Sequence, residues 1–100
     1  MNPHRGEASV RVGGELLTLR PSFAALVAVE EELGSLFALV ERAATGGVRL
    51  AEIVALFWHC LAERPVELTR ERLGEAVAAA GLKGVIPVVT VLLRQVMLGA

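Results

Sequence analysis

The alternation of apolar and polar residues near the N-terminus predicts a β-hairpin over residues 8–20. Two short alternating runs flank the Gly13-Gly14 pair, with valine as the apolar residue in the first run and leucine in the second. Two such runs around paired glycines are typical of a hairpin, because glycine accepts the positive φ of a tight primed turn. A two-stranded hairpin is marginally stable alone, so we expect it to pack on the helices that follow.

Residues 21–98 are expected to be helical, because their apolar residues recur at helical spacing between recognisable caps. Ser22, Ser35 and Thr69 each precede such a segment and can accept hydrogen bonds from free N–H groups at a helix start. Gly34 and Gly81 follow two of the segments as left-handed stops. The predicted helices are residues 21–33, 36–44, 50–64, 70–80 and 84–98.

The last of these segments is ambiguous in type. It is apolar almost all round, and the β-branched residues within 85–91 would also suit a strand. Its length and its final residues favour a helix, in which Pro87 fits only the first turn.

The first predicted helix carries a carboxylate on its apolar face. The stripe that we expect to face inward consists of Phe23, Leu26, Val27, Glu30 and Leu33. A carboxylate in that position needs a partner, for which Arg5 and Arg11 are the candidates. In the alternative orientation Leu26, Val29 and Leu33 face inward and Glu30 is solvated. Arg5, Glu7 and Glu30 are thus the candidate structural polar residues.

The predicted elements make a mostly α, α+β domain, in which the N-terminal β-hairpin packs on a bundle of about five short helices. The composition indicates more apolar residues than one small core needs. We expect a single domain over residues 1–100, flexible over residues 1–7. Of its residues 54% are hydrophobic but only 4% aromatic, and the mean hydropathy is +0.57. Apolar surface left outside a core usually serves a partner or an oligomer, so either a binding partner or a homo-oligomer is expected.

Charge and apolar run lengths exclude two classes of partner. The net charge is −1, whereas nucleic-acid binding draws on a basic excess, so no nucleic-acid partner is expected. The most apolar run, residues 85–93, is shorter than the about 20 residues that a membrane span requires. Cys60 is the single cysteine, and no apolar signal core precedes the hairpin. We therefore expect a cytoplasmic protein with no membrane partner.

No arrangement of residues in the sequence points to catalysis. Cys60 follows His59 directly, and adjacent side chains on a helix diverge by about 100°, which does not suit a nucleophile and its base. Two histidines 55 positions apart do not have the spacing of metal ligands. The glycine pairs lack the lysine of a phosphate-binding loop. We expect no enzyme activity, no metal and no cofactor.

The N-terminal third resembles a known family. Residues 2–7 (Asn-Pro-His-Arg-Gly-Glu), the glycine-containing hairpin with Leu-Thr-Leu-Arg at 17–20, Phe-Ala-Ala-Leu at 23–26 and the run from Glu30 to Gly34 look like the small proteins of gene transfer agents and related long-tailed phages. The most specific elements are Arg-Gly-Glu at 5–7 and the Leu26-x-x-x-Glu30 rhythm that ends in Gly34. In those particles the gene lies between the tail tube gene and the tape measure gene, and the family is classed with tail assembly chaperones while also carrying a tail-tube label.

The resemblance departs from the family pattern in the C-terminal half. There the family helix usually runs into a glycine-rich stretch, but residues 54–65 of this chain are bulkier and more aromatic. The similarity from Arg49 onward is confined to an apolar helix, a threonine-capped helix and an apolar tail.

The resemblance implies a tail assembly chaperone that binds the tape measure protein and possibly contacts the tail tube protein. The apolar residues that we expect to contact the partner are Phe57, Trp58, Val89, Leu92, Leu93 and Val96. The first alternative is a structural tail component, associated with the tail tube or its terminator. The second is a small helical regulatory binding module.

Overall fold

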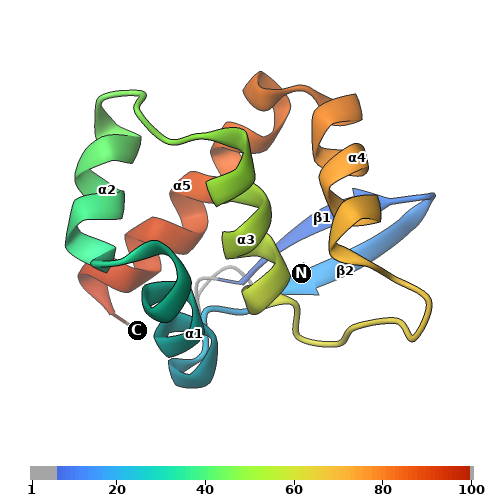
Figure 1. The fold of residues 1–100 in the computed structure, drawn as a ribbon, viewed down its shortest axis with the longest axis horizontal. Coiled ribbons are helices and arrows are strands. Elements are labelled where there is room, and N and C mark those ends of the chain that lie inside the picture. The colour runs from blue at the N-terminus through green and yellow to red at the C-terminus, as the bar shows by residue number, and fades with distance from the viewer. Residues whose placement is uncertain (1–6, 100) are drawn as a thin grey trace.

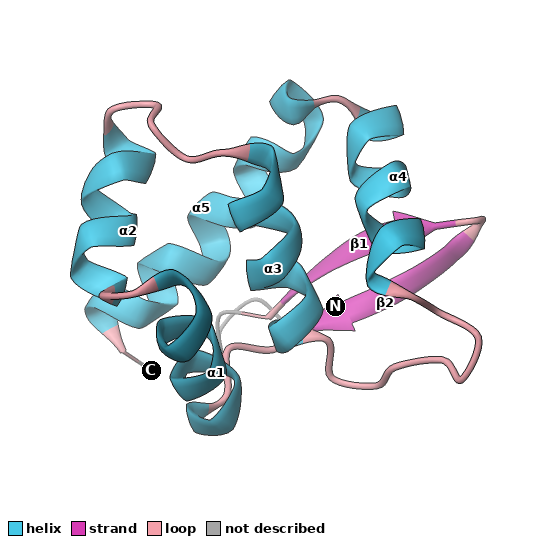
Figure 2. Cartoon of the chain, viewed as in Figure 1, coloured by secondary structure: helices cyan, strands magenta, loops and turns pink. Residues whose placement is uncertain are grey.

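The computed structural model describes residues 7–99 and contains a β-hairpin followed by five helices (Figures 1 and 2). The expected fold class, a mostly helical α+β domain with an N-terminal hairpin, is confirmed. Arg5 and most of the segment expected to be flexible, residues 1–7, lie outside the described residues. The elements are β1 (Ala8–Val12), β2 (Glu15–Leu19), α1 (Phe23–Leu33), α2 (Leu36–Ala44), α3 (Leu50–Cys60), α4 (Arg70–Ala80) and α5 (Leu82–Leu98).

The two strands pair in antiparallel register around the expected glycine turn. Val12 lies opposite Glu15, and Ala8 lies opposite Leu19. Gly13 and Gly14 have φ angles of 57° and 88°, which side chains other than glycine rarely adopt. The buried face of the hairpin packs against α4 and α5, so the expectation that it rests on helices is confirmed.

Side-chain caps fix the starts of three helices as the sequence predicts. The hydroxyl oxygens of Ser22, Ser35 and Thr69 accept hydrogen bonds from the backbone N–H groups three residues further on, at distances of 3.1–3.3 Å. Gly34, with φ 89°, ends α1, and its N–H donates to the carbonyl of Glu30. These local signals place the helix boundaries because they satisfy N–H and C=O groups that the helix itself leaves free.

Three helix boundaries differ from the prediction. Helix α1 begins at Phe23 and not at residue 21, because Ser22 occupies the capping position before it. Helix α3 ends at Cys60 and not at residue 64, because the chain there turns to pair with β2. The N–H of Arg20 donates to the carbonyl of Cys60, and the N–H of Ala62 donates to the carbonyl of Thr18. Helix α5 begins at Leu82, two residues earlier than expected, and the alternative of a strand over residues 85–91 is wrong.

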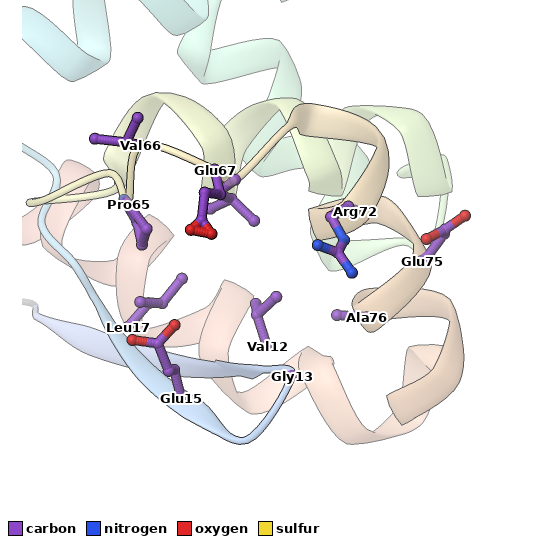
Figure 3. A pocket seen from close by; sticks show the side chains of 11 residues that line it. Val12, Gly13, Glu15, Leu17, Pro65, Val66, Glu67, Arg72, Glu75 and Ala76 are labelled. Atoms are coloured by element: carbon purple, nitrogen blue, oxygen red, sulfur yellow. The ribbon is translucent and has the colours of Figure 1, made fainter.

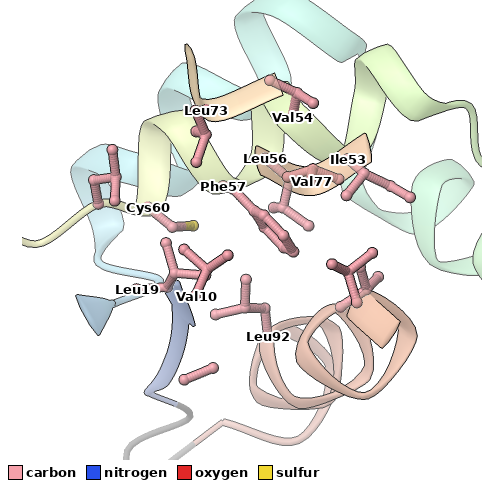
Figure 4. Close-up of a cluster of buried hydrophobic side chains, with 14 of the residues drawn as sticks. Val10, Leu19, Ile53, Val54, Leu56, Phe57, Cys60, Leu73, Val77 and Leu92 are labelled. Atoms are coloured by element: carbon pink, nitrogen blue, oxygen red, sulfur yellow. The ribbon is translucent and has the colours of Figure 1, made fainter. Parts of the chain in front are cut away.

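Helix α3 lies at the centre of the core. It packs between α1 and α4, and its side chains Ile53, Leu56, Phe57 and Cys60 are almost entirely buried. Figure 4 shows Phe57 among the buried side chains of the helices and the hairpin, with Leu92 of α5 beside it. Aliphatic side chains dominate this core, as the composition indicates.

The inward face of α1 is the alternative that the sequence left open. Val29 is fully buried, whereas Phe23 is 84% exposed and Val27 is 38% exposed, so the stripe containing Phe23, Val27 and Glu30 is wrong. The small Ala25 is also buried and lets α1 lie close to α3. Glu30 is exposed, and no buried ion pair is needed.

Replacing Phe57 with alanine tests the central position of α3. Phe57→Ala should lower the free energy of unfolding by about 3–5 kcal/mol, because it removes a fully buried ring and leaves a cavity. Urea denaturation followed by far-UV circular dichroism measures the loss. The matched control Phe37→Ala, at a side chain that is 72% exposed, should change stability by less than about 0.5 kcal/mol. Equal losses of stability for the two variants would contradict the placement of Phe57 at the centre of the core.

Candidate functional site

An apolar groove runs between α2 and α5. Its volume is about 460 Å³, within the range of about 300–1,000 Å³ that is usual for binding sites. On the α2 side, the wall is formed by Val40, Ala43 and Ala44 of the helix and by Gly46 and Val48 of the loop that follows it. Ile53 of α3 contributes to the lining, and the α5 side consists of Leu82, Ile86, Val89, Thr90, Leu93, Arg94, Met97 and Leu98.

The groove gathers exposed apolar side chains. Leu82, Ile86 and Met97 are each about half exposed, and Leu98 is 75% exposed. Thr90 and Arg94 are the polar side chains among the residues that line it. Contiguous exposed apolar surface of this kind marks a place where a soluble protein contacts something else.

The groove exists because α5 is apolar on more than one side while α2 buries little of itself. One side of α5 places Val85, Val89 and Leu92 in the core, and the adjoining side lines the groove with its apolar residues partly exposed. Helix α2 follows α1 after a two-residue link, and Leu39 is its buried residue. Helix α2 packs on α1, so the space toward α5 stays open.

An ion pair fixes the α2 wall to α3. Arg42 Nη1 lies 2.7 Å from Glu52 Oε1, and the same carboxylate oxygen accepts the N–H of Arg49, at 2.9 Å. The Arg42 guanidinium and then the Arg49 N–H lower the pKa of the Glu52 carboxyl from 4.5 to about 2. Glu52 therefore serves two purposes: it satisfies a free N–H at the start of α3 and holds α2 in place.

The six apolar residues expected to contact a partner occupy different environments. Phe57 and Leu92 have no exposed surface, so in this conformation they serve the core. Val89 and Leu93 are about 5% exposed and line the groove. Trp58 and Val96 are half-buried and lie outside the groove lining. Contact between this set and a partner stays a prediction, and the groove brings two of its members to one surface.

Trp58 is covered by two arginines. The guanidinium carbon of Arg64 lies 4.1 Å from the centre of the indole ring, and that of Arg70 lies 5.8 Å from it. Glu32 of α1 accepts from Arg70 at 2.7 Å and lies 2.8 Å from Nε2 of His59. Hydrogen bonds first from Arg70 and then from His59 lower the pKa of Glu32 to about 2. This cluster ties α1, α3 and α4 together and leaves Trp58 partly shielded by cation–π contacts.

Glu7 and Glu30, the candidate structural polar residues within the described part of the chain, both accept hydrogen bonds. Glu7 is buried and accepts a hydrogen bond from Nε of Arg20, which joins the start of β1 to the end of β2. Glu30 Oε2 accepts the N–H of Leu36 at 3.1 Å and so helps to cap α2. Arg11 donates to the carbonyl of Gly14 within the hairpin and does not pair with Glu30.

A second hollow, of about 490 Å³, lies between the hairpin tip, the loop of residues 65–68 and α4 (Figure 3). Its charged lining consists of Glu15, Glu67, Glu75 and Arg72. Val66 at its edge is fully exposed. Acidic and basic groups are mixed there with apolar ones, so this hollow presents less continuous apolar surface than the groove.

The thiol of Cys60 is buried in the core. Burial raises the pKa of the Cys60 thiol to about 12, so the thiol remains protonated at neutral pH.

Residues 7–99 hold no cluster of three or more histidine, cysteine, aspartate or glutamate side chains able to bind a metal ion. In the same residues, no single helix has the length and hydropathy to cross a membrane. Helices α4 and α5 meet those criteria only as a pair, and they are bent by 115° at their junction.

Sequence reasoning missed the exposed side of α5. An available signal was the spacing of residues 82, 86, 90, 94 and 98, which places them in one row along the helix. This row could not be recognised, because the expected helix began at residue 84 and because α5 is apolar almost all round. Hydrophobic spacing alone therefore did not show which side would be covered.

Protonation of Glu52 should weaken the fold. Because its folded pKa lies below the unfolded value of 4.5, Glu52 stabilises the fold above pH 4.5, and this contribution is lost as the pH falls toward 2. Urea denaturation between pH 7 and pH 2 should show Glu52→Gln to be less stable than the wild type at pH 7. The difference should shrink through that acidic window. A control variant, Glu63→Gln at an exposed loop position, should show no such pH-dependent difference, and a constant difference for Glu52→Gln would contradict the ion pair's role.

Comparison with known proteins identifies the family. No curated protein and no solved structure matches the chain. Residues 5–99 match the family model described as "Phage tail tube protein, GTA-gp10", which covers the hairpin and all five described helices. The chain therefore belongs to this family of phage and gene transfer agent tail proteins.

Proposed function

We propose that this tail protein is an assembly chaperone that binds the tape measure protein in the cytoplasm and keeps it soluble while the tail forms. The observation that carries the proposal is the apolar groove between α2 and α5. Family membership supports a role in the tail, and the groove supports binding of an apolar segment.

The lining of the groove suits a helix. Two of its sides are helices, and binding of an amphipathic helix in such a groove depends on apolar anchors spaced along one face. Full burial of an aliphatic side chain such as Leu82 or Ile86 is worth about 1.5–3 kcal/mol, and these two are about half exposed. Covering several of them together provides a favourable free energy for association.

The resemblance found in the sequence supports the choice of partner. In the family that it indicates, the gene lies beside the tape measure gene, and the tape measure protein is apolar and prone to form helices. Such a protein exposes apolar helix faces before the tube encloses it. A small protein with a preformed apolar groove is suited to covering one of those faces.

We further propose that the chain has no catalytic activity. The two carboxylates with strongly lowered pKa values, Glu32 and Glu52, are engaged in ion pairs between helices. The thiol of Cys60 is buried and has a raised pKa. These perturbed groups serve the fold and do not face the groove.

A structural role in the tail is the second candidate. The description of the matching family names a tail tube protein, and this favours a protein that remains in the particle. The sheet argues for the chaperone, because its two strands of five residues offer little strand for building a tube wall. A structural component would be found in purified particles in ring-like stoichiometry, whereas a chaperone would be absent from them.

A charge placed in the groove should weaken partner binding strongly. We expect Ile86→Glu to reduce recovery of soluble tape measure protein by about tenfold, because a carboxylate would be buried against apolar surface. The measurement is co-expression of the tagged chain with the tape measure protein, followed by pull-down. Val66→Glu makes the same change at a fully exposed apolar residue outside the groove and should bind like the wild type. Wild-type recovery with Ile86→Glu would contradict the proposal.

A further inference from the structure

The exposed side of α5 has an ordered pattern of chemistry along the groove. Every fourth residue is exposed, and all of them line the groove: Leu82, Ile86, Thr90, Arg94 and Leu98. From one end to the other the row is therefore apolar, apolar, hydroxyl, cation and apolar. Over the 16 residue steps from Leu82 to Leu98, this row extends about 24 Å along the helix.

Arg94 is the charged residue among those that line the groove. It forms no ion pair with any residue in the described range 7–99. The guanidinium of Arg42 on α2 is paired with Glu52. Within residues 7–99, Arg94 is thus a cation without an ion-pair partner, on a groove lining that is otherwise apolar apart from the Thr90 hydroxyl one turn before it.

An apolar helix that fills the groove would remove water from the Arg94 guanidinium. Loss of that hydration is unfavourable unless a group of opposite charge replaces it. A carboxylate does so best, because it accepts two parallel hydrogen bonds from a guanidinium. A partner with only apolar residues facing α5 would therefore bind less well than one with a carboxylate at this point.

We infer that the groove recognises a helix of about four turns that presents apolar side chains toward Leu82, Ile86 and Leu98 and a carboxylate toward Arg94. This inference rests on the proposed function and specifies which segment of the tape measure protein binds. The charge selects the register of that segment, since sliding it by one turn moves the carboxylate away from Arg94 and toward Thr90 or Leu98, neither of which carries a positive charge. A small apolar molecule would occupy part of the volume but would not use the full row.

The test uses fluorescein-labelled peptides of about 20 residues that together cover the tape measure protein, with binding measured by fluorescence anisotropy. Arg94→Glu should weaken the tightest-binding peptide by about tenfold or more. Replacement of the peptide's facing Asp or Glu with Lys should restore binding to Arg94→Glu. Raising the salt concentration to about 0.5 M should weaken wild-type binding and affect Arg94→Glu less.

The matched control is Lys83→Glu, the same charge reversal on the same helix at an exposed residue outside the groove lining. It should leave the dissociation constant within about twofold of the wild type. Circular dichroism checks that each variant retains its helices.

Two outcomes separate this inference from the function on which it rests. If Arg94→Glu binds like the wild type while Ile86→Glu does not, the groove binds a helix but the carboxylate requirement is overturned. If neither variant differs from the wild type, or if no peptide binds, both the inference and the proposed groove function are overturned. Equal weakening by Arg94→Glu and Lys83→Glu would also overturn the inference, since it would show a general charge effect.

Discussion

The packing of α3 between α1 and α4 decides which apolar surface of this protein remains outside the core. Phe57 and Cys60 are fully buried there, and the hairpin and α5 complete the enclosure. Helix α2 is left to pack on α1 and to reach α3 through the Arg42–Glu52 ion pair. Since no element of residues 7–99 fills the space between α2 and α5, the groove follows from the same packing that stabilises the fold.

Local signals in the sequence predicted most of the fold. The glycine pair of the hairpin, the capping residues Ser22, Ser35 and Thr69 and the stop at Gly34 all act within a few residues, so they can be recognised without knowing the rest of the structure. The end of α3 at Cys60 could not be predicted in this way. It depends on backbone hydrogen bonds to β2, about forty residues earlier in the chain.

Which face of a helix is buried was harder to predict than where the helix lies. In α1 the sequence pattern allowed two inward faces. The structure buries the face with Val29, where the small Ala25 one turn earlier allows close packing on α3. In α5 apolar residues occur all round, so the excess of apolar surface could be predicted but its location could not. Of the residues chosen from the sequence, Phe57 and Leu92 are core residues and Val89 and Leu93 line the groove at about 5% exposure, while Ile86 and Met97 provide its exposed surface.

The central claim is that the groove between α2 and α5 is the surface that binds a tail protein during assembly. The most direct test is hydrogen–deuterium exchange of the chain alone and of the chain co-purified with the tape measure protein, compared peptide by peptide. The account predicts added protection in α2 and α5, with little change in the hairpin. Protection confined to the hairpin, or failure of the two proteins to form a complex, would contradict it.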